Sequence, residues 1–414
     1  MTRLLFVTPF KFFPEALGGA QISTHQLLSG LVDEGWEVGA VCRLSSPFSR
    51  PYLRVLSQAL SRGALPGLCV TDDTLGYRCW RLVGLPHVRP LRRLDRKLAH
   101  RSFARHLDAF RPDVVLGDIS ADCPWLRQAL ARGYPCIHLA RSIRAIGAPN
   151  ISPPNLFFAA NSPYTASILE AITGRAIEVV RPMVRAEDYR VERREPRFVT
   201  FINPVPQKGV EIALEIARRM PGTRFLFVKG KWPLARTKTM EALVRPALDL
   251  PNVEVWEHQH DMRSVYRVTR VLLAPSQFRE TFGRVILEAH INGIPVVAAR
   301  VAGVPYTLGE GGILVEPKHD VEAYVKALQQ LEQDPALYEK LSRLALENSQ
   351  RPELSPGHQL RTFVRFVNEQ VLEATRASGA GAPSLTHAAS VGGRSVGGSS
   401  IRAEPAPASS IRGP

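Results

Sequence analysis

Cysteines are few in this sequence, and long apolar runs are missing from it. The five cysteines among 414 residues are scattered and never spaced as Cys-x-x-Cys, which argues against a disulfide framework and a zinc site and favours reduced thiols. No stretch approaches the roughly 18 to 20 apolar residues that cross a bilayer. The first ten residues carry neither a cationic leader nor a small-residue cleavage site. We therefore expect a cytoplasmic protein.

The length and the composition favour two globular domains. A single domain usually holds about 100 to 200 residues, so 414 residues are too many for one ordinary core. Hydrophobic residues make up 45% and charged residues 22% of the chain, and this balance excludes disorder over most of it.

The chain is strongly basic. Its formal net charge of +15 and its pI near 10.0 indicate attraction to a nucleotide, an acidic lipid surface or nucleic acid. No nucleic-acid-reading motif accompanies the basic residues, so nucleic acid ranks last and we expect none as a partner.

Much of the excess charge lies between residues 81 and 111, where nine lysines and arginines stand against two aspartates. Apolar residues of this stretch, such as Leu98, Phe103 and Leu107, recur at near-helical spacing, which predicts a helix with one apolar stripe and a cationic opposite face. Two interpretations stay open. The helix either packs on its own domain with a solvated outer face, or it makes a peripheral contact with anionic lipid at the inner face of a membrane.

Short apolar runs alternate with helical patterns along the chain, which is typical of parallel sheets covered on both faces. In the first half we expect strands over residues 4–8, 37–42, 113–116 and 135–139 and a helix over 21–34, with irregular loops over 45–89. In the second half we expect strands over 198–202, 224–228, 253–256, 271–274, 295–298 and 313–315 and helices over 210–219 and 284–292.

Breaks in this pattern divide the chain into four parts. Arg181-Pro182 and the charged run over 190–196 interrupt the alternation, which restarts at Phe198. We expect a first doubly wound domain over 1–190, a second over 191–356 and a closing helix over 357–375. The remainder, 376–414, consists mainly of Ala, Gly, Ser and Pro and is expected to be a disordered tail.

Two glutamates mark the segment from Pro275 to Val315. Glu280 and Glu288 stand eight residues apart around a Thr-Phe-Gly-Arg sequence. If a helix begins near Gly283, Glu280 lies in the loop before it and Glu288 lies on its second turn. A helix start offers unpaired backbone N–H groups to a phosphate, and a glycine there lets a ligand approach the backbone. On spacing alone, solvent-exposed carboxylates remain the alternative for both.

Several blocks of this segment resemble the C-terminal signature of the retaining family 4 glycosyltransferases. The matching residues are Pro275-Ser276, Arg279-Glu280-Thr281-Phe282-Gly283, Glu288-Ala289, Gly293-Ile294-Pro295-Val296-Val297 and Gly303-Val304-Pro305. Two further blocks resemble the family's phosphate-binding lysine turn and its glycine loop after the first strand: Pro206-Gln207-Lys208-Gly209 and Gly18-Gly19. The similarity runs from about residue 4 to residue 315 and is strongest near its end.

The resemblance implies a GT-B fold, in which two Rossmann-like α/β domains face a cleft. It also implies an enzyme that moves a sugar from a nucleotide-diphosphate donor, linked to UDP or GDP, to an acceptor with retention of anomeric configuration. The first domain would be the acceptor side, and the acceptor would be a glycan, a lipid-linked sugar or a small molecule. Alternatives are a non-catalytic protein that binds nucleotide sugars and a sugar-nucleotide epimerase of the same architecture.

Site residues follow from the resemblance position by position. It gives Glu280 as the ligand of the donor-sugar hydroxyls and Lys208 as the cation that neutralises the diphosphate, and these two are the expected catalytic residues. Glu288 would bind the ribose hydroxyls. The other expected donor-binding residues are Gly18, Gly19, Asn203, Thr281, Phe282 and Gly283, together with Glu257, His258 and Gln259 for the nucleobase.

Four positions depart from the family's pattern. Asn203 stands where the family usually has an arginine, and an amide carries no charge. Arg141 and Asp118 replace histidines that are common in the first domain, and Tyr306 replaces an acidic residue after the Gly-Val-Pro turn. These replacements indicate a divergent subfamily or lost activity, and the nearby His138 is expected to be structural.

No Asp-x-Asp triplet occurs in the chain, so the usual carboxylate holder of a metal-bridged diphosphate is missing. We expect neither a metal nor a cofactor, because a lysine and backbone amides can supply the positive field instead. By resemblance, the departing phosphate oxygen helps to take the acceptor proton, so the reaction needs no dedicated nucleophile.

Overall fold

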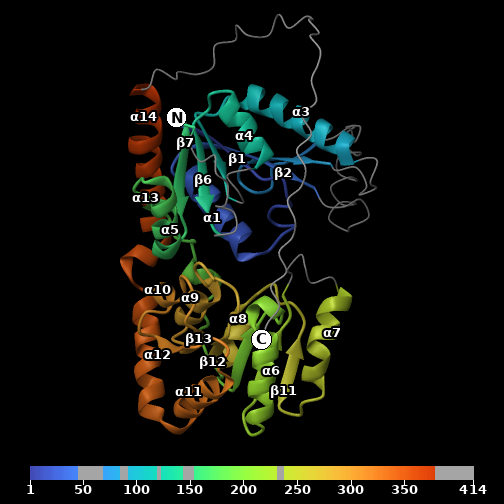
Figure 1. The fold of residues 1–414 in the computed structure, drawn as a ribbon, viewed down its shortest axis with the longest axis vertical. Coiled ribbons are helices and arrows are strands. Elements are labelled where there is room, and N and C mark those ends of the chain that lie inside the picture. Colours follow the sequence, from blue (N-terminus) through green and yellow to red (C-terminus); the bar gives the residue numbers. More distant parts are fainter. Residues whose placement is uncertain (45–68, 84–91, 119–122, 143–152, 231–236, 378–414) are drawn as a thin grey trace, which may run out of the picture. The chain divides into compact units, whose positions relative to one another are not determined.

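Short apolar runs form the strands of this chain, and the strands assemble into two sheets (Figure 1). The computed structural model describes residues 1–44, 69–83, 92–118, 123–142, 153–230 and 237–377. Helices follow most strands and pack on both faces of each sheet. The fold is therefore of the α/β class, with two Rossmann-like domains.

The first sheet has eight strands in the order β3-β4-β2-β1-β5-β6-β7-β8, and every neighbouring pair is parallel except β3 with β4. Its elements are β1 (Arg3–Val7), α1 (Gly19–Asp33), β2 (Glu37–Arg43), β3 (Cys69–Asp72), β4 (Arg78–Leu82), α3 (Arg92–Phe110), β5 (Val114–Gly117), α4 (Pro124–Ala131), β6 (Cys136–Ala140), β7 (Leu156–Ala160), α5 (Pro163–Thr173) and β8 (Glu178–Val179). The strand order reverses between β1 and β5. Ligands of open α/β sheets bind at the carboxyl ends of strands beside such a reversal.

Both faces of the first sheet are buried. Leu4 and Phe6 of β1 join the core formed with α1, whereas Leu5 and Val7 join the core formed with α3 and α4. Since each strand meets helices on both sides, it can be apolar throughout, and this continuity makes the strand recognisable in the sequence.

The second sheet has six strands in the order β11-β10-β9-β12-β13-β14, and all of its pairs are parallel. Its elements are β9 (Phe198–Ile202), the 3-10 turn η4 (Pro206–Lys208), α6 (Val210–Arg219), β10 (Phe225–Val228), α7 (Thr237–Leu248), β11 (Val253–Trp256), α8 (Arg263–Val268), β12 (Thr269–Ala274), α9 (Arg284–His290), β13 (Val296–Ala299), α10 (Val304–Leu308), β14 (Gly312–Val315), α11 (Val321–Gln333) and α12 (Pro335–Ser349). A 3-10 turn, Ala186–Asp188, lies between the two sheets in sequence. Here the strand order reverses between β9 and β12.

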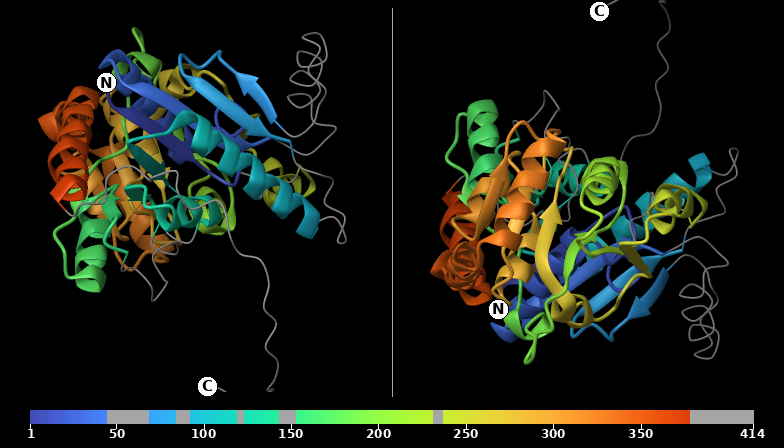
Figure 2. Two further views of the ribbon diagram at one scale, coloured as in Figure 1. Left: turned by 90° about the horizontal axis from the view of Figure 1, so that it is seen from above. Right: turned by 90° about the horizontal axis from the view of Figure 1, so that it is seen from below.

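The last described helices return to the first domain. After a 3-10 turn (Pro352–Leu354), α13 (Pro356–Arg365) runs into a π-helical segment (Phe366–Leu372) and then into α14 (Glu373–Ala377). Phe363, Phe366 and Val367 are buried in the same core as Leu4 and Phe6. Figures 1 and 2 show these helices in red beside the blue N-terminal segment. The predicted closing helix therefore completes the core of the first domain.

The expected strands and helices occur close to their predicted positions, but the prediction of irregular loops over 45–89 is wrong where β3 and β4 form an antiparallel pair. Polar side chains interrupt the apolar pattern of these two strands, so the sequence does not predict them. Arg81 is 1% exposed and donates to Asp72 Oδ2 at 2.7 and 2.9 Å and to the carbonyl oxygen of Phe13 at 2.7 Å. A buried ion pair thus occupies positions where the strand pattern would place apolar residues.

Two predictions about the ends of the domains stay predictions. The boundary at 190/191 falls between the last strand of the first sheet, which ends at Val179, and the first strand of the second, which begins at Phe198. The predicted tail lies outside the described residues from 378 onward. Within the described part of the chain, no helix is both long and apolar enough to cross a membrane.

Candidate functional site

Lys208 and Glu280 meet where the strand order of the second sheet reverses. Lys208 ends the 3-10 turn after β9, and Glu280 lies in the loop after β12. Lys208 Nζ donates to Glu280 Oε2 at 2.5 Å, and Ser276 Oγ donates to the same oxygen at 3.0 Å. The two charged side chains are 17% and 15% exposed, so solvent still reaches the pair. The structure therefore brings together the two residues that the sequence assigned to catalysis.

Two glycines let the surrounding loops approach this pair. Gly209 has φ of +84°, and a Cβ there would lie 2.1 Å from the carbonyl oxygen of Pro275. Gly303 donates its N–H to the carbonyl oxygen of Glu280 at 2.9 Å, and a Cβ there would lie 1.8 Å from the carbonyl oxygen of Thr281. Any side chain at either position would push apart the loops that carry Lys208 and Glu280.

Asn203 follows β9 in a left-handed backbone conformation, with φ of +64°. Asparagine tolerates this region better than most residues, because its short polar side chain bonds locally. Its Oδ1 atom is buried without a hydrogen-bond partner in the part of the chain that the structure describes, and the side chain lies against Gly230, where a Cβ would meet Oδ1 at 2.4 Å. The backbone conformation gives a reason for asparagine at a position where the family usually has arginine. Its contact with a phosphate stays a prediction.

Glu288 lies on α9, which begins after Gly283 as predicted but ends at His290. The side chain is buried, and each carboxylate oxygen accepts a hydrogen bond: Oε1 from Arg284 Nε at 2.8 Å and Oε2 from Tyr266 Oη at 2.7 Å. The alternative of a solvent-exposed carboxylate is therefore wrong for Glu288. Its role toward ribose stays a prediction.

Arg284 is a buried residue that the sequence reasoning did not select. Its guanidinium contacts Glu288 on its own helix, Ser23 and Gln26 on α1, and the connecting segment at Met183 and Tyr189. The spacing of four residues between Arg284 and Glu288 is a signal that could have found it, because opposite charges at i and i+4 meet on one face of a helix.

Thr281 links the signature loop to the first domain. Its hydroxyl donates to the carbonyl oxygen of Arg141 at 2.8 Å and accepts from Asn161 Nδ2 at 2.9 Å. Thr281 and Phe282 are buried, and Gly283 has φ of +81° as the residue that precedes α9. The loop that carries Glu280 is therefore held from both domains.

A buried charge pair lies at the carboxyl edge of the first sheet, where Asp118 follows β5 and Arg141 follows β6. Arg141 Nε is 3.9 Å from Asp118 Oδ2, and Thr24 Oγ1 donates to that oxygen at 2.8 Å while accepting from Arg141 Nη2 at 3.0 Å. Burial raises the pKa of Asp118 and lowers the pKa of Arg141 to about 10. Among the described residues, Asp118 Oδ1 and Arg141 Nε have no hydrogen-bond partner.

The glycine loop and His138 also belong to the first domain. Gly18 precedes α1, and Gly19 begins it so close to Arg284 that a Cβ on Gly19 would lie 3.3 Å from Arg284 Cδ. His138 is fully buried on β6, and burial lowers its pKa to about 4, so the imidazole is neutral at pH 7.

Tyr306, the fourth position that departs from the family's pattern, lies on α10 of the second domain and is 51% exposed.

The residues expected near the nucleobase follow β11, the outermost strand beside β10. Glu257 pairs with Lys229 at 2.6 Å, Gln259 donates to the carbonyl oxygen of Glu257 at 2.8 Å, and the His258 ring lies 5.2 Å from the His260 ring. These contacts join Gln259 to Glu257, Glu257 to Lys229 directly after β10, and His258 to His260. They do not join them to Lys208, so their role stays a prediction.

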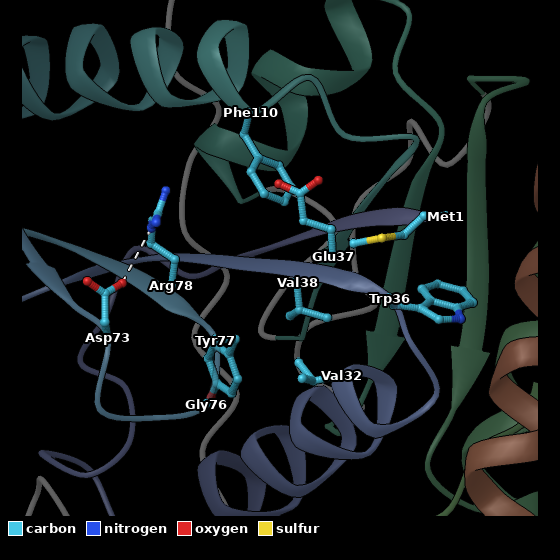
Figure 3. Close-up of a pocket in the computed structure, with 10 residues that line it drawn as sticks. All are labelled: Met1, Val32, Trp36, Glu37, Val38, Asp73, Gly76, Tyr77, Arg78 and Phe110. Carbon is cyan, nitrogen blue, oxygen red and sulfur yellow. Dashed lines mark hydrogen bonds and ion pairs between the residues drawn. The ribbon is translucent and has the colours of Figure 1, made fainter.

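A cavity of about 480 Å³ lies elsewhere on the first domain (Figure 3). Its lining includes Trp36, Glu37, Tyr77, Arg78 and Phe110. Glu37 and Arg78 begin their strands, so the cavity lies at the amino ends of the strands, opposite to the edge where parallel sheets bind ligands. None of the predicted site residues lines it. Across the described ranges, no three His, Cys, Asp or Glu side chains are grouped so that they could hold a metal ion.

Part of the second domain is similar to a recognised family. Residues 196–334 match the model of the family described as glycosyl transferases group 1. A D-inositol 3-phosphate glycosyltransferase of Saccharomonospora viridis is 44% identical over 93 residues, which are 22% of this chain and 21% of that protein. One of Mycolicibacterium smegmatis is 31% identical over 163 residues, or 37% of this chain and 36% of that protein. This chain thus spans about a fifth to a third of the length of these two relatives.

Solved structures share the fold over nearly the whole chain at low sequence identity. Sucrose-phosphate synthase of Thermosynechococcus elongatus has a TM-score of 0.69 at 17% identity and covers 88% of this chain and 98% of its own. The Anabaena protein HepE, solved with UDP and glucose, has a TM-score of 0.64 at 16% identity and covers 89% of this chain and 100% of its own. The stretch that matches the glycosyl transferases group 1 model includes Lys208, Glu280 and Glu288, and the solved structures show that the chain has a GT-B fold.

Proposed function

We propose that this chain is a glycosyltransferase that moves a sugar from a nucleotide-diphosphate donor to an acceptor hydroxyl. The observation that carries the proposal is the contact between Lys208 and Glu280 at the strand reversal of the second sheet. A cation and a carboxylate on two adjacent loops at this edge suit a ligand with a diphosphate at one end and sugar hydroxyls at the other.

The ion pair gives each residue a role when the donor binds. Lys208 exchanges its bond with Glu280 for bonds to the diphosphate, where its charge stabilises the leaving group. Glu280 then accepts from the donor-sugar hydroxyls while Ser276 keeps holding Oε2. The bond between the anomeric carbon and the phosphate oxygen breaks, the bond to the acceptor oxygen forms on the same face, and the acceptor proton passes to the departing phosphate oxygen. This proposal needs neither a metal nor a cofactor.

Support for the donor class comes from structural neighbours that share the fold. HepE was solved with UDP-glucose, and a TarM variant of S. aureus was solved with UDP. We propose UDP-linked sugars first and GDP-linked sugars second. For the acceptor we propose a glycan, a lipid-linked sugar or a small molecule, and the names of the relatives make an inositol phosphate one small molecule to include in a panel.

A non-catalytic nucleotide-sugar-binding protein is the second candidate, and Asn203 favours it. An uncharged amide replaces the family's usual arginine there, which removes a charge from leaving-group stabilisation.

A panel of nucleotide sugars tests the proposal, with released nucleoside diphosphate measured in the presence and absence of acceptors. We expect one donor to be consumed by the unaltered chain, and we expect Glu280→Gln and Lys208→Met each to slow that consumption by about 100-fold or more. Glu215→Gln on the exposed face of α6 is the matched control, because Glu215 contacts only Arg218 and Arg219 among the ion pairs of the described residues. Binding of a donor without turnover in the unaltered chain would establish the second candidate instead.

We further propose a peripheral contact with an anionic inner membrane face, made by α3. The helix packs Phe103, Leu107 and Phe110 into its own domain, so this part of its apolar stripe is not available to lipid, and only Leu94 among its large apolar side chains is exposed, at 48%. Its outer face exposes Arg93, Arg96, Lys97, Arg101 and Arg105. The contact would therefore be electrostatic, with no insertion of an apolar helix face.

A further inference from the structure

Arg284 is satisfied by a complete set of hydrogen-bond acceptors. A guanidinium has five N–H groups. Five acceptors surround this one: Glu288 Oε1 at 2.8 Å, Ser23 Oγ at 2.6 Å, Tyr189 Oη at 2.9 Å, Gln26 Oε1 at 3.4 Å and the carbonyl oxygen of Met183. Since a buried charge is tolerated only when it is paired and hydrogen-bonded, this geometry suits arginine and no other side chain.

These acceptors come from three separate segments. Glu288 belongs to α9, Ser23 and Gln26 belong to α1, and Met183 and Tyr189 belong to the segment that connects the two sheets. Gly19, at the start of α1, packs against the aliphatic part of the same arginine. The guanidinium is therefore fixed from outside α9, and it can hold a neighbour on α9 in one orientation.

That neighbour is Glu288, which has hydrogen-bonding capacity left. Arg284 Nε occupies one site on Oε1, and Tyr266 Oη occupies one site on Oε2. An ionised carboxylate has about four lone-pair sites, so two remain for a pair of hydroxyl donors. Two adjacent hydroxyls match this remaining pair, and the family resemblance assigns the ribose hydroxyls of the donor to Glu288.

We propose that Arg284 is a positioning residue that fixes the Glu288 carboxylate for the ribose 2′- and 3′-hydroxyls of the donor nucleotide. The inference rests on the proposed function, because it takes a nucleotide as the ligand. Arg284 does not touch the nucleotide itself. It links ribose recognition on α9 to residues of α1, so that the position of Glu288 depends on a contact with the first domain.

Comparing the affinities for a nucleotide and for its 2′,3′-dideoxy form separates the positioning of Glu288 from an effect on the stability of the fold. UDP, GDP and ADP are first titrated into the full chain by calorimetry, and the tightest binder is then compared with its 2′,3′-dideoxy form. We expect the unaltered chain to bind the ribose form about tenfold more tightly or better, because hydrogen bonds to a buried carboxylate are lost in the dideoxy form. We expect this ratio to fall toward one in Arg284→Lys, with little change in the affinity for the dideoxy form.

Matched variants separate positioning from packing. Glu288→Gln should also reduce the ratio, and Tyr266→Phe should reduce it partly, since it removes the other hydrogen bond to the carboxylate. Ser23→Ala removes one acceptor from Arg284 without altering α9, and a fall of the ratio by about two- to threefold is expected there even if Arg284→Lys does not fold. Arg218→Lys, at an exposed arginine of α6, should leave the ratio unchanged.

Two different failures can be told apart. Equal weakening of both nucleotides in Arg284→Lys and in Ser23→Ala would show that Arg284 serves only packing, and the inference would be overturned while the proposed function stands. If none of the three nucleoside diphosphates binds to the unaltered chain, the proposed function and this inference are overturned together.

Discussion

His290 is a buried side chain whose hydrogen bonds require its neutral form. It is fully buried on α9, its Nδ1 accepts from Asn348 Nδ2 at 2.8 Å, and its Nε2 donates to the carbonyl oxygen of Gly311 at 3.1 Å. Both nitrogens are thus engaged in the neutral form. Burial lowers the pKa of His290 to about 3 from its ordinary value of 6.5.

The pKa of His290 predicts acid sensitivity with a defined sign. Between pH 6.5 and about 3 the unfolded chain binds a proton at this histidine that the folded chain does not, so stability is lost as pH falls through this window. We expect His290 to contribute a slope of roughly 1.4 kcal/mol per pH unit there, measured as the free energy of unfolding in urea. His290→Gln should flatten the slope, whereas His319→Gln, at an exposed histidine, should not. Parallel slopes in the two variants would contradict the prediction.

At the scale of elements, α13 holds the C-terminal segment on the first domain. Phe363 is fully buried in the core that also contains Leu4 and Phe6. We expect Phe363→Ala to lower the free energy of unfolding by about 3 to 5 kcal/mol, followed through the fluorescence of Trp36, Trp80 and Trp125. Leu346→Ala, at a side chain of α12 that is 38% exposed, should cost less than about 1 kcal/mol. Equal losses in the two variants would show that α13 does not complete this core.

The outer face of α3 predicts salt-dependent lipid binding. Flotation with vesicles that contain phosphatidylglycerol should recover the chain at low ionic strength and lose it near 0.5 M salt, where charges are screened within about 4 Å. Arg96→Gln combined with Arg101→Gln should weaken the binding, and Lys340→Gln combined with Arg343→Gln on α12 is the control of equal charge. Binding that survives high salt would contradict a purely electrostatic contact.

At the scale of the whole molecule, Thr281 tests the link between the two domains. Thr281→Val keeps the shape of the side chain but leaves Asn161 Nδ2 and the carbonyl oxygen of Arg141 without a partner. We expect a loss of about 1 to 3 kcal/mol in the free energy of unfolding. Thr223→Val, which removes one exposed bond to Glu332, should change it by less than about 0.5 kcal/mol. A loss no larger than that of the control would mean that this contact does not hold the domains together.

The residue pattern predicts two parallel sheets and most of their strands, and the family resemblance assigns Lys208 and Glu280 to one site. Local rules suffice there, because a strand buried on both faces is a continuous apolar run and because the signature residues stand at fixed positions after their strands. Three features become visible only in the folded chain: Arg81 and Asp72 lie within strands, α13 belongs to the first core, and Arg284 contacts Ser23 and Met183. Each of these contacts joins residues on different elements. The pattern of residues within one segment does not show which residue of another segment will pair with a buried charge.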